Sequence, residues 1–212
     1  MLAAVAIAFL AAWAFVSHGI PAASRALAAT IPPGLLSHAS AETLAMLDRR
    51  LLTDTELSTA EQEKVAEIFA RVRRAAGADG ICCRLLFRKG QKIGANALAL
   101  PDGTVIVTDQ LISRASPGGL TGVLAHEIAH VEKRHTLRGL IEASLLSVVV
   151  MTALGDLSEM AEILVSYPIL LMRLGYSRDF EREADDFALE IMARMGVSPD
   201  ELASLLENIT GK

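Results

Sequence analysis

Charged residues are scarce in this chain, and no part of it carries a run of lysine or arginine. Of its 212 residues, 21% are charged and 52% are hydrophobic, and the mean hydropathy is +0.40. The usual charged share is about a quarter, so long disordered tracts are not expected, whereas contact with a membrane is. With a net charge of −5 and no basic block, nucleic acid is not expected as a partner.

Cysteine is almost absent as well. The two cysteines, Cys82 and Cys83, are adjacent, and neighbours in sequence rarely reach disulfide geometry. The pair therefore does not define a redox compartment, and two buried thiols are expected. There is no internal repeat and no low-complexity tract. The length suits one domain, or one domain with an appendage.

The N-terminal segment contains no charged side chain before Arg25. Residues 1–20 are mostly apolar and just long enough to cross a bilayer, which takes about 20 helical residues. Pro21 is expected to end the helix. We predict an uncleaved single-pass anchor that contacts membrane lipid, in a bacterial inner membrane, with either orientation open. The alternatives are a buried core helix and a signal peptide cleaved near residues 26–28, although the basic start of a signal is missing.

The remainder, residues 27–212, is predicted to form one mainly helical domain. Residues 27–76 are expected to be helical, most clearly in the stretch after Ser58 and Thr59, where acidic side chains lie near the start, arginines near the end, and glycines follow. Further helices are expected at residues 116–135, 178–195 and 199–208. Residues 143–155 and 163–172 are strongly apolar but too short to span a bilayer, so a buried or membrane-dipping helical hairpin is expected.

Three short runs between these helices have strand character: residues 81–88, 96–101 and 104–109. The turn at residues 101–103 joins the last two, as in a hairpin. The predicted fold class is therefore α+β, mainly helical, with a small antiparallel sheet beside the histidine-bearing helix.

Only five histidines occur, yet two of them stand four apart in the stretch HEIAH. Residues four apart share one face of a helix, so His126 and His130 can meet at one point. Zinc accepts imidazole nitrogen and leaves one position open in catalytic sites. Glu127 lies beside that point and can act as general base toward water activated by zinc. The alternative is an amphipathic helix with solvated histidines.

A third protein ligand must come from elsewhere in the chain. His135 lies about 180° from His126 around the same helix, so it cannot join the site unless the helix ends first. It is expected either as a cation near the helix end or at the edge of the site.

The best source for the missing ligand is the predicted helix at residues 178–195. Glu181 and Asp185 fall at the margin of its apolar face, where two carboxylates need a cation or a donor. We assign Glu181 as the zinc ligand and Asp185 as the group that holds a ligand imidazole by its far N–H. Small residues Ala184 and Ala188 would let the helices approach closely. The opposite arc is expected to face solvent; it contains Arg182, Glu183, Asp186 and Glu190.

These stretches resemble a known family. HEIAHVEKRH, SRDFEREADDFAL and NALALPDGTVIVTDQLI occur in the order found in membrane-associated zinc metallopeptidases that include the CAAX prenyl endopeptidase and bacterial HtpX. The resemblance covers about half the chain, roughly residues 90–195. It implies a zincin-like fold of the gluzincin type, one Zn²⁺ on His126, His130 and Glu181, and Glu127 as base.

The resemblance also implies a substrate cleft along the strand at residues 96–100, where Asn96 and Ala97 could contact a peptide backbone. Only one clear span exists, so the chain is most similar to small bacterial members with a single anchor, and specificity for prenylated peptides is not carried over. One departure is that residues 117–119, Pro-Gly-Gly, stand where the family usually has an acid, which predicts a looser helix start.

The function that follows is a membrane-associated zinc endopeptidase acting on peptides or unfolded proteins. Candidates for stabilising the oxyanion are Tyr176, Arg178 and His135. Two alternatives stay open: a non-catalytic, chaperone-like module that keeps zinc for structure, and a membrane scaffold with accidental histidines. An intact Glu127 argues against the non-catalytic module. The metal content of purified protein would decide whether the chain is only a scaffold.

Overall fold

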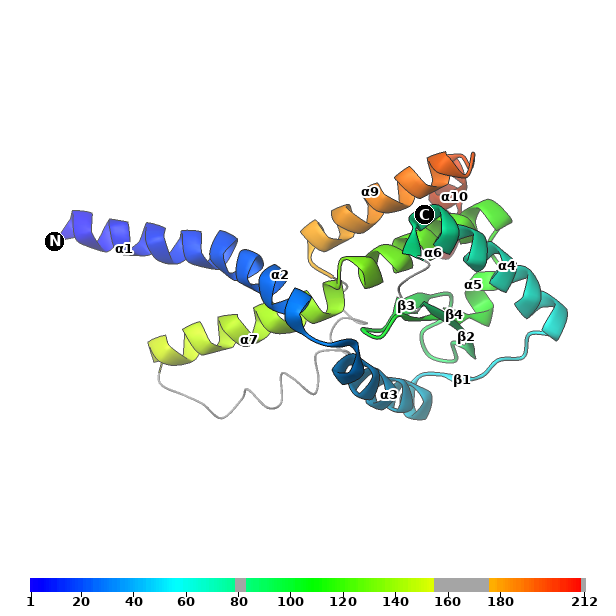
Figure 1. The fold of residues 1–212 in the computed structure, drawn as a ribbon, viewed down its shortest axis with the longest axis horizontal. Coiled ribbons are helices and arrows are strands. Elements are labelled where there is room, and N and C mark those ends of the chain that lie inside the picture. Colours follow the sequence, from blue (N-terminus) through cyan, green and yellow to red (C-terminus); the bar gives the residue numbers. More distant parts are fainter. Residues whose placement is uncertain (79–82, 155–175, 211–212) are drawn as a thin grey trace. The chain divides into compact units, whose positions relative to one another are not determined.

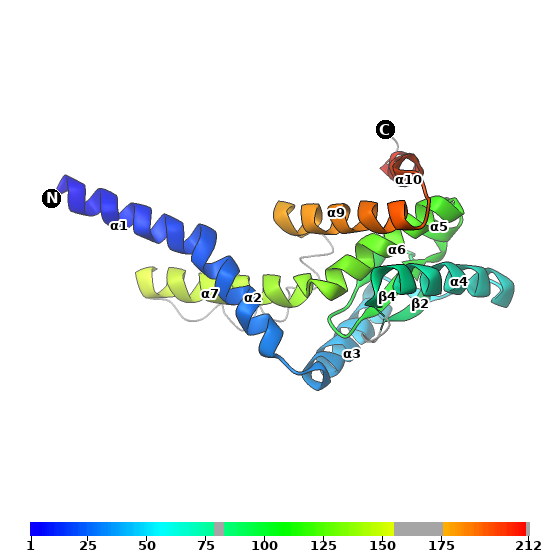
Figure 2. The same ribbon diagram turned by 45° about the horizontal axis from the view of Figure 1, so that its top comes forward.

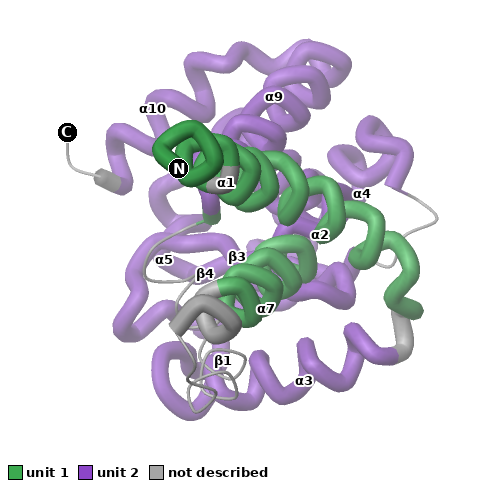
Figure 3. Tube along the Cα trace, turned by 90° about the vertical axis from the view of Figure 1, so that its left-hand side faces the viewer, with its two compact units in different colours: residues 1–32, 136–176 green, residues 33–135, 177–212 purple. Residues whose placement is uncertain are grey.

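The computed structural model describes residues 1–78, 83–154 and 176–210, and these divide into two compact units. One unit consists of residues 1–32 and 136–176, and the other of residues 33–135 and 177–212 (Figure 3). The grouping of residues 136–176 with the N-terminal segment does not follow the expected division into residues 1–20 and 27–212. That division stays a prediction.

The larger unit contains a four-stranded sheet in the order β1-β2-β4-β3 (Figure 1). The strands are β1 (Thr53–Asp54), β2 (Arg84–Lys89), β3 (Ala97–Ala99) and β4 (Thr104–Thr108). The hairpin of β3 and β4 is antiparallel as predicted, but β2 pairs with β4 in parallel. The prediction of an antiparallel sheet is therefore wrong, and the sheet is mixed. β4 lies between β2 and β3. The alternation of apolar and polar residues along each strand carries no information about the order of the strands in the sheet.

The short strand β3 forms one edge of this sheet. Leu100 donates its backbone N–H to Thr104, and Asn96 accepts from the backbone N–H of Thr108. Because backbone groups alternate in direction along an antiparallel strand, those of Ala97 and Ala99 point away from β4, toward the free edge.

Among the described residues of the larger unit, helices surround the sheet or extend from it: α3 (Pro33–Arg50), α4 (Thr59–Ala76), α5 (Asp109–Ile112), α6 (Pro117–Glu132), α9 (Arg178–Arg194) and α10 (Pro199–Thr210). The helix expected after Ser58 and Thr59 is confirmed: Ser58 and Glu61 form a reciprocal capping box, and Gly77 ends the helix at φ 69°. The expectation of helix over all of residues 27–76 is wrong at residues 31–32 and 51–58, which are not helical and include β1. α6 lies between α9 and the sheet (Figures 1 and 2), and it contributes Leu124, Ala125 and Ile128 to the core.

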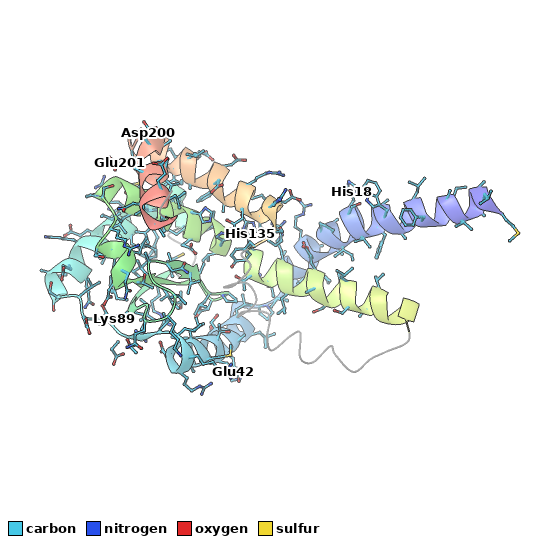
Figure 4. The ribbon with its side chains drawn as sticks, turned by 180° about the vertical axis from the view of Figure 1, so that it is seen from behind. His18, Glu42, Lys89, His135, Asp200 and Glu201 are labelled. Atoms are coloured by element: carbon cyan, nitrogen blue, oxygen red, sulfur yellow. The ribbon has the colours of Figure 1, made fainter. Side chains whose placement is uncertain are left out.

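The start of α6 is not loose, contrary to the expectation from its Pro-Gly-Gly sequence. Ser116 caps it by accepting the backbone N–H of Gly119 at 3.0 Å. The Ser116 hydroxyl in turn donates to Glu201 on α10, so an acid reaches this position from another helix (Figure 4). Glycine is needed here because a Cβ on Gly118 would lie 2.7 Å from Cγ of Glu201. The small residues let α10 pack directly on α6.

The smaller unit contains α1 (Leu2–Ala14), a π-helical turn η1 (Phe15–Gly19) and α2 (Ile20–Thr30), which run on as one helix, together with most of α7 (His135–Leu154). The expectation that Pro21 ends the helix is wrong. Proline lacks the N–H that an α-helix would use, and the wider π-turn just before it, in which Ile20 N–H reaches the Phe15 carbonyl, accommodates that loss. The helix of 29 residues, Leu2–Thr30, is long and apolar enough to cross a membrane.

Within this unit, Ser24 on α2 donates to Glu142 on α7 at 2.7 Å. The first part of the expected apolar hairpin is helical, as part of α7. Its second part, residues 163–172, lies outside the described residues, as does Cys82. Cys83 is buried, as expected.

Candidate metal centre and active site

The predicted metal ligands come together in the larger unit. Nε2 of His126 and Nε2 of His130 lie 2.9 Å apart, and Oε2 of Glu181 lies 3.4 Å from Nε2 of His126. One ligand atom from each of the three residues falls within 4.8 Å of the other two. Two imidazole nitrogens and a carboxylate oxygen are a donor set that suits zinc, with a fourth position left for solvent or substrate. The residues present therefore fit the metal.

The close packing of α6 against α9 sets this geometry. Ala125 and Ala129 on α6, and Ala184 and Ala188 on α9, are all completely buried. With small side chains at the contact, the two helix backbones approach closely, which brings Glu181 within reach of the histidines. The prediction made for Ala184 and Ala188 is confirmed.

Two further carboxylates flank the ligands. Nδ1 of His126 lies 3.0 Å from Oδ1 of Asp185, so the imidazole can donate to this acid while Nε2 faces the metal position. The structure thus places Asp185 where the sequence predicted it. Glu127 is buried, with 8% of its surface exposed, and the backbone N–H of Ala99 on β3 acts on its carboxyl group and lowers its pKa, less strongly than burial raises it.

The model of peptidase family M48 matches residues 59–211, which include every element of this site. The chain belongs to peptidase family M48. Its similarity to known metalloproteases agrees with this membership.

Two relatives of this M48 peptidase extend over most of it. It is 31% identical to the mitochondrial metalloendopeptidase OMA1 of Saccharomyces cerevisiae over 159 residues, which are 69% of this chain and 45% of that protein. It is 27% identical to the metalloprotease YcaL of Escherichia coli over 179 residues, 82% of this chain and 70% of YcaL. The metalloprotease LoiP of the same bacterium matches at 28% over 120 residues, 54% of this chain and 47% of LoiP. The chain thus spans less than half the length of OMA1, and the narrower likeness to the CAAX prenyl endopeptidase and HtpX is not confirmed.

Burial dominates the electrostatics of the M48 site. It raises the pKa of Glu127 from 4.5 to about 7, with a smaller opposing effect of His126. Burial also lowers the pKa of His130 far below its usual value, aided by the neighbouring imidazoles, so this ring is neutral at pH 7. For His126, burial lowers the pKa, but the surrounding carboxylates, Glu181 first, outweigh burial and raise it.

His135 does not lie on the surface of the site. α6 ends at Glu132, and Arg134 then adopts φ 54°, so His135 begins a new helix (Figure 4). Its side chain is completely buried, and its Nδ1 lies 2.9 Å from Nδ1 of His130. The predicted direct contact of His135 with substrate or oxyanion is therefore wrong, since the ring lies behind a metal ligand.

Glu183 lies in a different environment from the one that the sequence predicts. It was expected on a solvated face, but its Oε2 lies 3.1 Å from Nε2 of the buried His135. Predicting this contact would have required knowing that α6 ends before His135. The sequence has no glycine or proline there to mark the end of the helix.

The remaining residues predicted to contact substrate or the oxyanion lie at several places in the fold. Arg178 is exposed at the first position of α9. Tyr176 belongs to the smaller unit, where its hydroxyl lies 2.5 Å from Oγ1 of Thr136. Asn96 pairs with Thr108, and Ala97 lies on the free edge of β3. Roles for these residues in catalysis stay predictions.

Proposed function

We propose that this chain is a membrane-associated, zinc-dependent endopeptidase that cleaves peptides or unfolded proteins. The observation that carries the proposal is the convergence of His126, His130 and Glu181 beside a buried Glu127. An amphipathic helix with accidental histidines would have no reason to direct both Nε2 atoms at a carboxylate from a distant helix. The family membership supports the peptidase activity.

In this proposal His126, His130 and Glu181 hold one Zn²⁺. When bound, zinc supplies Lewis-acid polarisation of the peptide carbonyl and of the attacking water. Glu127 accepts the proton of that water and delivers it to the leaving amine. A pKa raised toward 7 by burial suits a group that must take up a proton and release it within one cycle. Nearby positive charge of the ion would lower this pKa again.

The edge strand β3 is proposed to bind the substrate backbone. The backbone groups of Ala97 and Ala99 point toward its free edge, and β3 packs against α6. An extended peptide that pairs with this edge would run alongside Glu127, because Ala99 itself contacts that carboxylate. Such pairing depends on backbone rather than side chains, which suits a peptidase of broad specificity.

Residues 1–20 are proposed to anchor the chain in a membrane. Large apolar side chains are exposed along this segment; they include Val5, Ile7, Phe9, Leu10 and Trp13. A helix that is apolar on all sides and buries little of itself in protein suits a lipid environment. A cleaved signal peptide is the alternative for the same segment.

The test compares the full chain with its Glu127→Gln variant in detergent, measuring zinc content and cleavage of an unfolded, fluorescently labelled protein. The proposal expects one zinc per chain in both and cleavage only in the wild type. Glu190→Gln, on the exposed face of α9, is the matched control and should cleave normally. Zinc in both forms with cleavage in neither would favour the non-catalytic module instead.

A further inference from the structure

A chain of three side chains runs from the metal site into the protein. Nδ1 of His130 lies 2.9 Å from Nδ1 of His135, and Nε2 of His135 lies 3.1 Å from Oε2 of Glu183. His130 is only 3% exposed and His135 is completely buried, so these two rings lie beneath the site, and the partly exposed Glu183 follows them.

The positions of the ring nitrogens allow one proton arrangement when a metal is bound. A neutral His130 that binds through Nε2 carries its proton on Nδ1. That N–H faces Nδ1 of His135, which must then accept and hold its own proton on Nε2. The Nε2–H of His135 in turn donates to the carboxylate of Glu183. Every step pairs one donor with one acceptor.

The middle ring is held in place by packing as well. His135 stacks on Phe180 with ring centroids 4.5 Å apart and planes 6° from parallel. Phe180 belongs to α9, the helix that also carries Glu183 and Glu181. α9 therefore supplies the ligand Glu181, the acid Glu183 that ends the series of three side chains, and the aromatic ring against which His135 packs.

The two ligand histidines thus have different supports. His126 contacts Asp185 directly, and that acid is 60% exposed at its side chain. His130 lies too deep for direct contact with solvated acids and instead meets Glu183 through His135. Partners of this kind fix the orientation and the basicity of a ligand imidazole.

We propose that Glu183, acting through His135, is a positioning pair that fixes the His130 ring with Nε2 directed at the metal. The inference rests on the proposed zinc site and adds two residues to it. Neither residue is among the three proposed zinc ligands, so their effect should be seen in the affinity of the site for zinc.

The experiment measures zinc affinity of the full chain in detergent by competition with a chromophoric chelator. Glu183→Ala should weaken zinc binding about 10- to 100-fold. Glu183→Gln, whose amide oxygen can still accept from His135, should restore much of the loss. Glu190→Ala, on the exposed face of the same helix, is the matched control and should bind zinc like the wild type.

A second comparison separates positioning from a general loss of structure. In His135→Asn, the shorter amide oxygen can still accept from His130 but cannot reach Glu183. If Glu183 acts through His135, adding Glu183→Ala to His135→Asn should cause no further loss of affinity. Cobalt(II)-loaded Glu183→Ala should also show visible absorption bands shifted from those of the wild type, because the ligand ring turns.

The outcomes distinguish the two proposals. A wild-type chain that takes up no zinc would overturn the zinc site and the positioning pair together. Tight zinc binding by the wild type and equally tight binding by Glu183→Ala would overturn only the positioning pair. Equal losses from Glu183→Ala in the wild-type and His135→Asn backgrounds would likewise overturn it.

Discussion

The backbone N–H of Ala99 on β3 acts on the carboxyl group of Glu127 on α6 and lowers its pKa. The contact joins the proposed general base on α6 to the edge strand proposed to bind substrate. A peptide that pairs with β3 is therefore positioned by the same segment of backbone that orients the base.

Ala99→Pro removes this N–H, and proline is tolerated at the outward positions of an edge strand. Losing this donor should raise the pKa of Glu127 further, so kcat at neutral pH is expected to fall by about tenfold while zinc content stays unchanged. Ala97→Pro is the comparison: it removes an outward N–H that does not serve Glu127, and should mainly raise KM. An unchanged kcat in Ala99→Pro would count against the contact.

In metal-free protein, the carboxyl group of Glu127 should favour folding less as pH rises, whereas the lowered pKa of His130 acts in the opposite direction. The pKa of Glu127 is raised from 4.5 to about 7 in the fold, so the folded state binds this proton more tightly than the unfolded state. The contribution is fully present below about pH 4.5 and is lost as pH rises through about 7. Glu127→Gln removes the penalty, and near pH 8 its metal-free form should be more stable than wild type by roughly 3 kcal/mol. Urea unfolding of both proteins at several pH values measures the difference between their free energies of unfolding. A difference that stays constant from about pH 4 to 8 would contradict the prediction.

Asp185→Ala should weaken zinc binding by about tenfold, the lower end of the range for partners of ligand imidazoles, since this acid is largely exposed. The reason is that His126 loses the acceptor that orients its Nδ1–H. The same chelator competition measures it, with the exposed neighbour Asp186→Ala as control. If both substitutions had the same effect, the loss would reflect surface charge rather than the contact with His126.

Gly122→Ala should destabilise the protein although alanine favours helices. A Cβ at this position would lie 2.9 Å from Cβ of Leu202 and 3.0 Å from Sδ of Met192. Overpacking costs about 1–3 kcal/mol, which outweighs the gain of about 1 kcal/mol in helix propensity. Thermal unfolding should show a Tm lower by a few degrees, on the order of 2–4 °C per kcal/mol for a chain of this size. A raised Tm would show that α10 does not pack on the glycines as described.

Mass spectrometry of the chain purified from membranes tests the anchor. An uncleaved anchor gives the full mass of 22.6 kDa, and the protein should stay in the membrane after alkaline extraction. A mature chain beginning near Ala29 would instead identify residues 1–28 as a signal peptide.

Much of the site could be predicted from the sequence because the key residues are paired by short spacings within single helices. The spacing of His126 and His130 on one helix, and of Glu181 and Asp185 on another, is decided by helical geometry alone. The structure brings these groups together as expected.

The contacts of His130 with His135 and Glu183 could not be predicted, because they depend on a change in chain direction and on tertiary packing. Continuing the helix past Lys133 puts His135 on the wrong face, and only the left-handed backbone of Arg134, a residue that rarely adopts it, redirects the chain. The partner Glu183 then depends on the tertiary approach of α9. The order of the strands was missed similarly, since the position of β4 between β2 and β3 is a long-range choice.

The most direct test of the whole account is a crystal structure of the zinc-loaded chain with anomalous data at the zinc edge. The account predicts one ion bonded to Nε2 of His126, Nε2 of His130 and a carboxylate oxygen of Glu181, at about 2.0–2.2 Å. An ion bound elsewhere, or a Glu181 carboxylate turned away from it, would contradict the account.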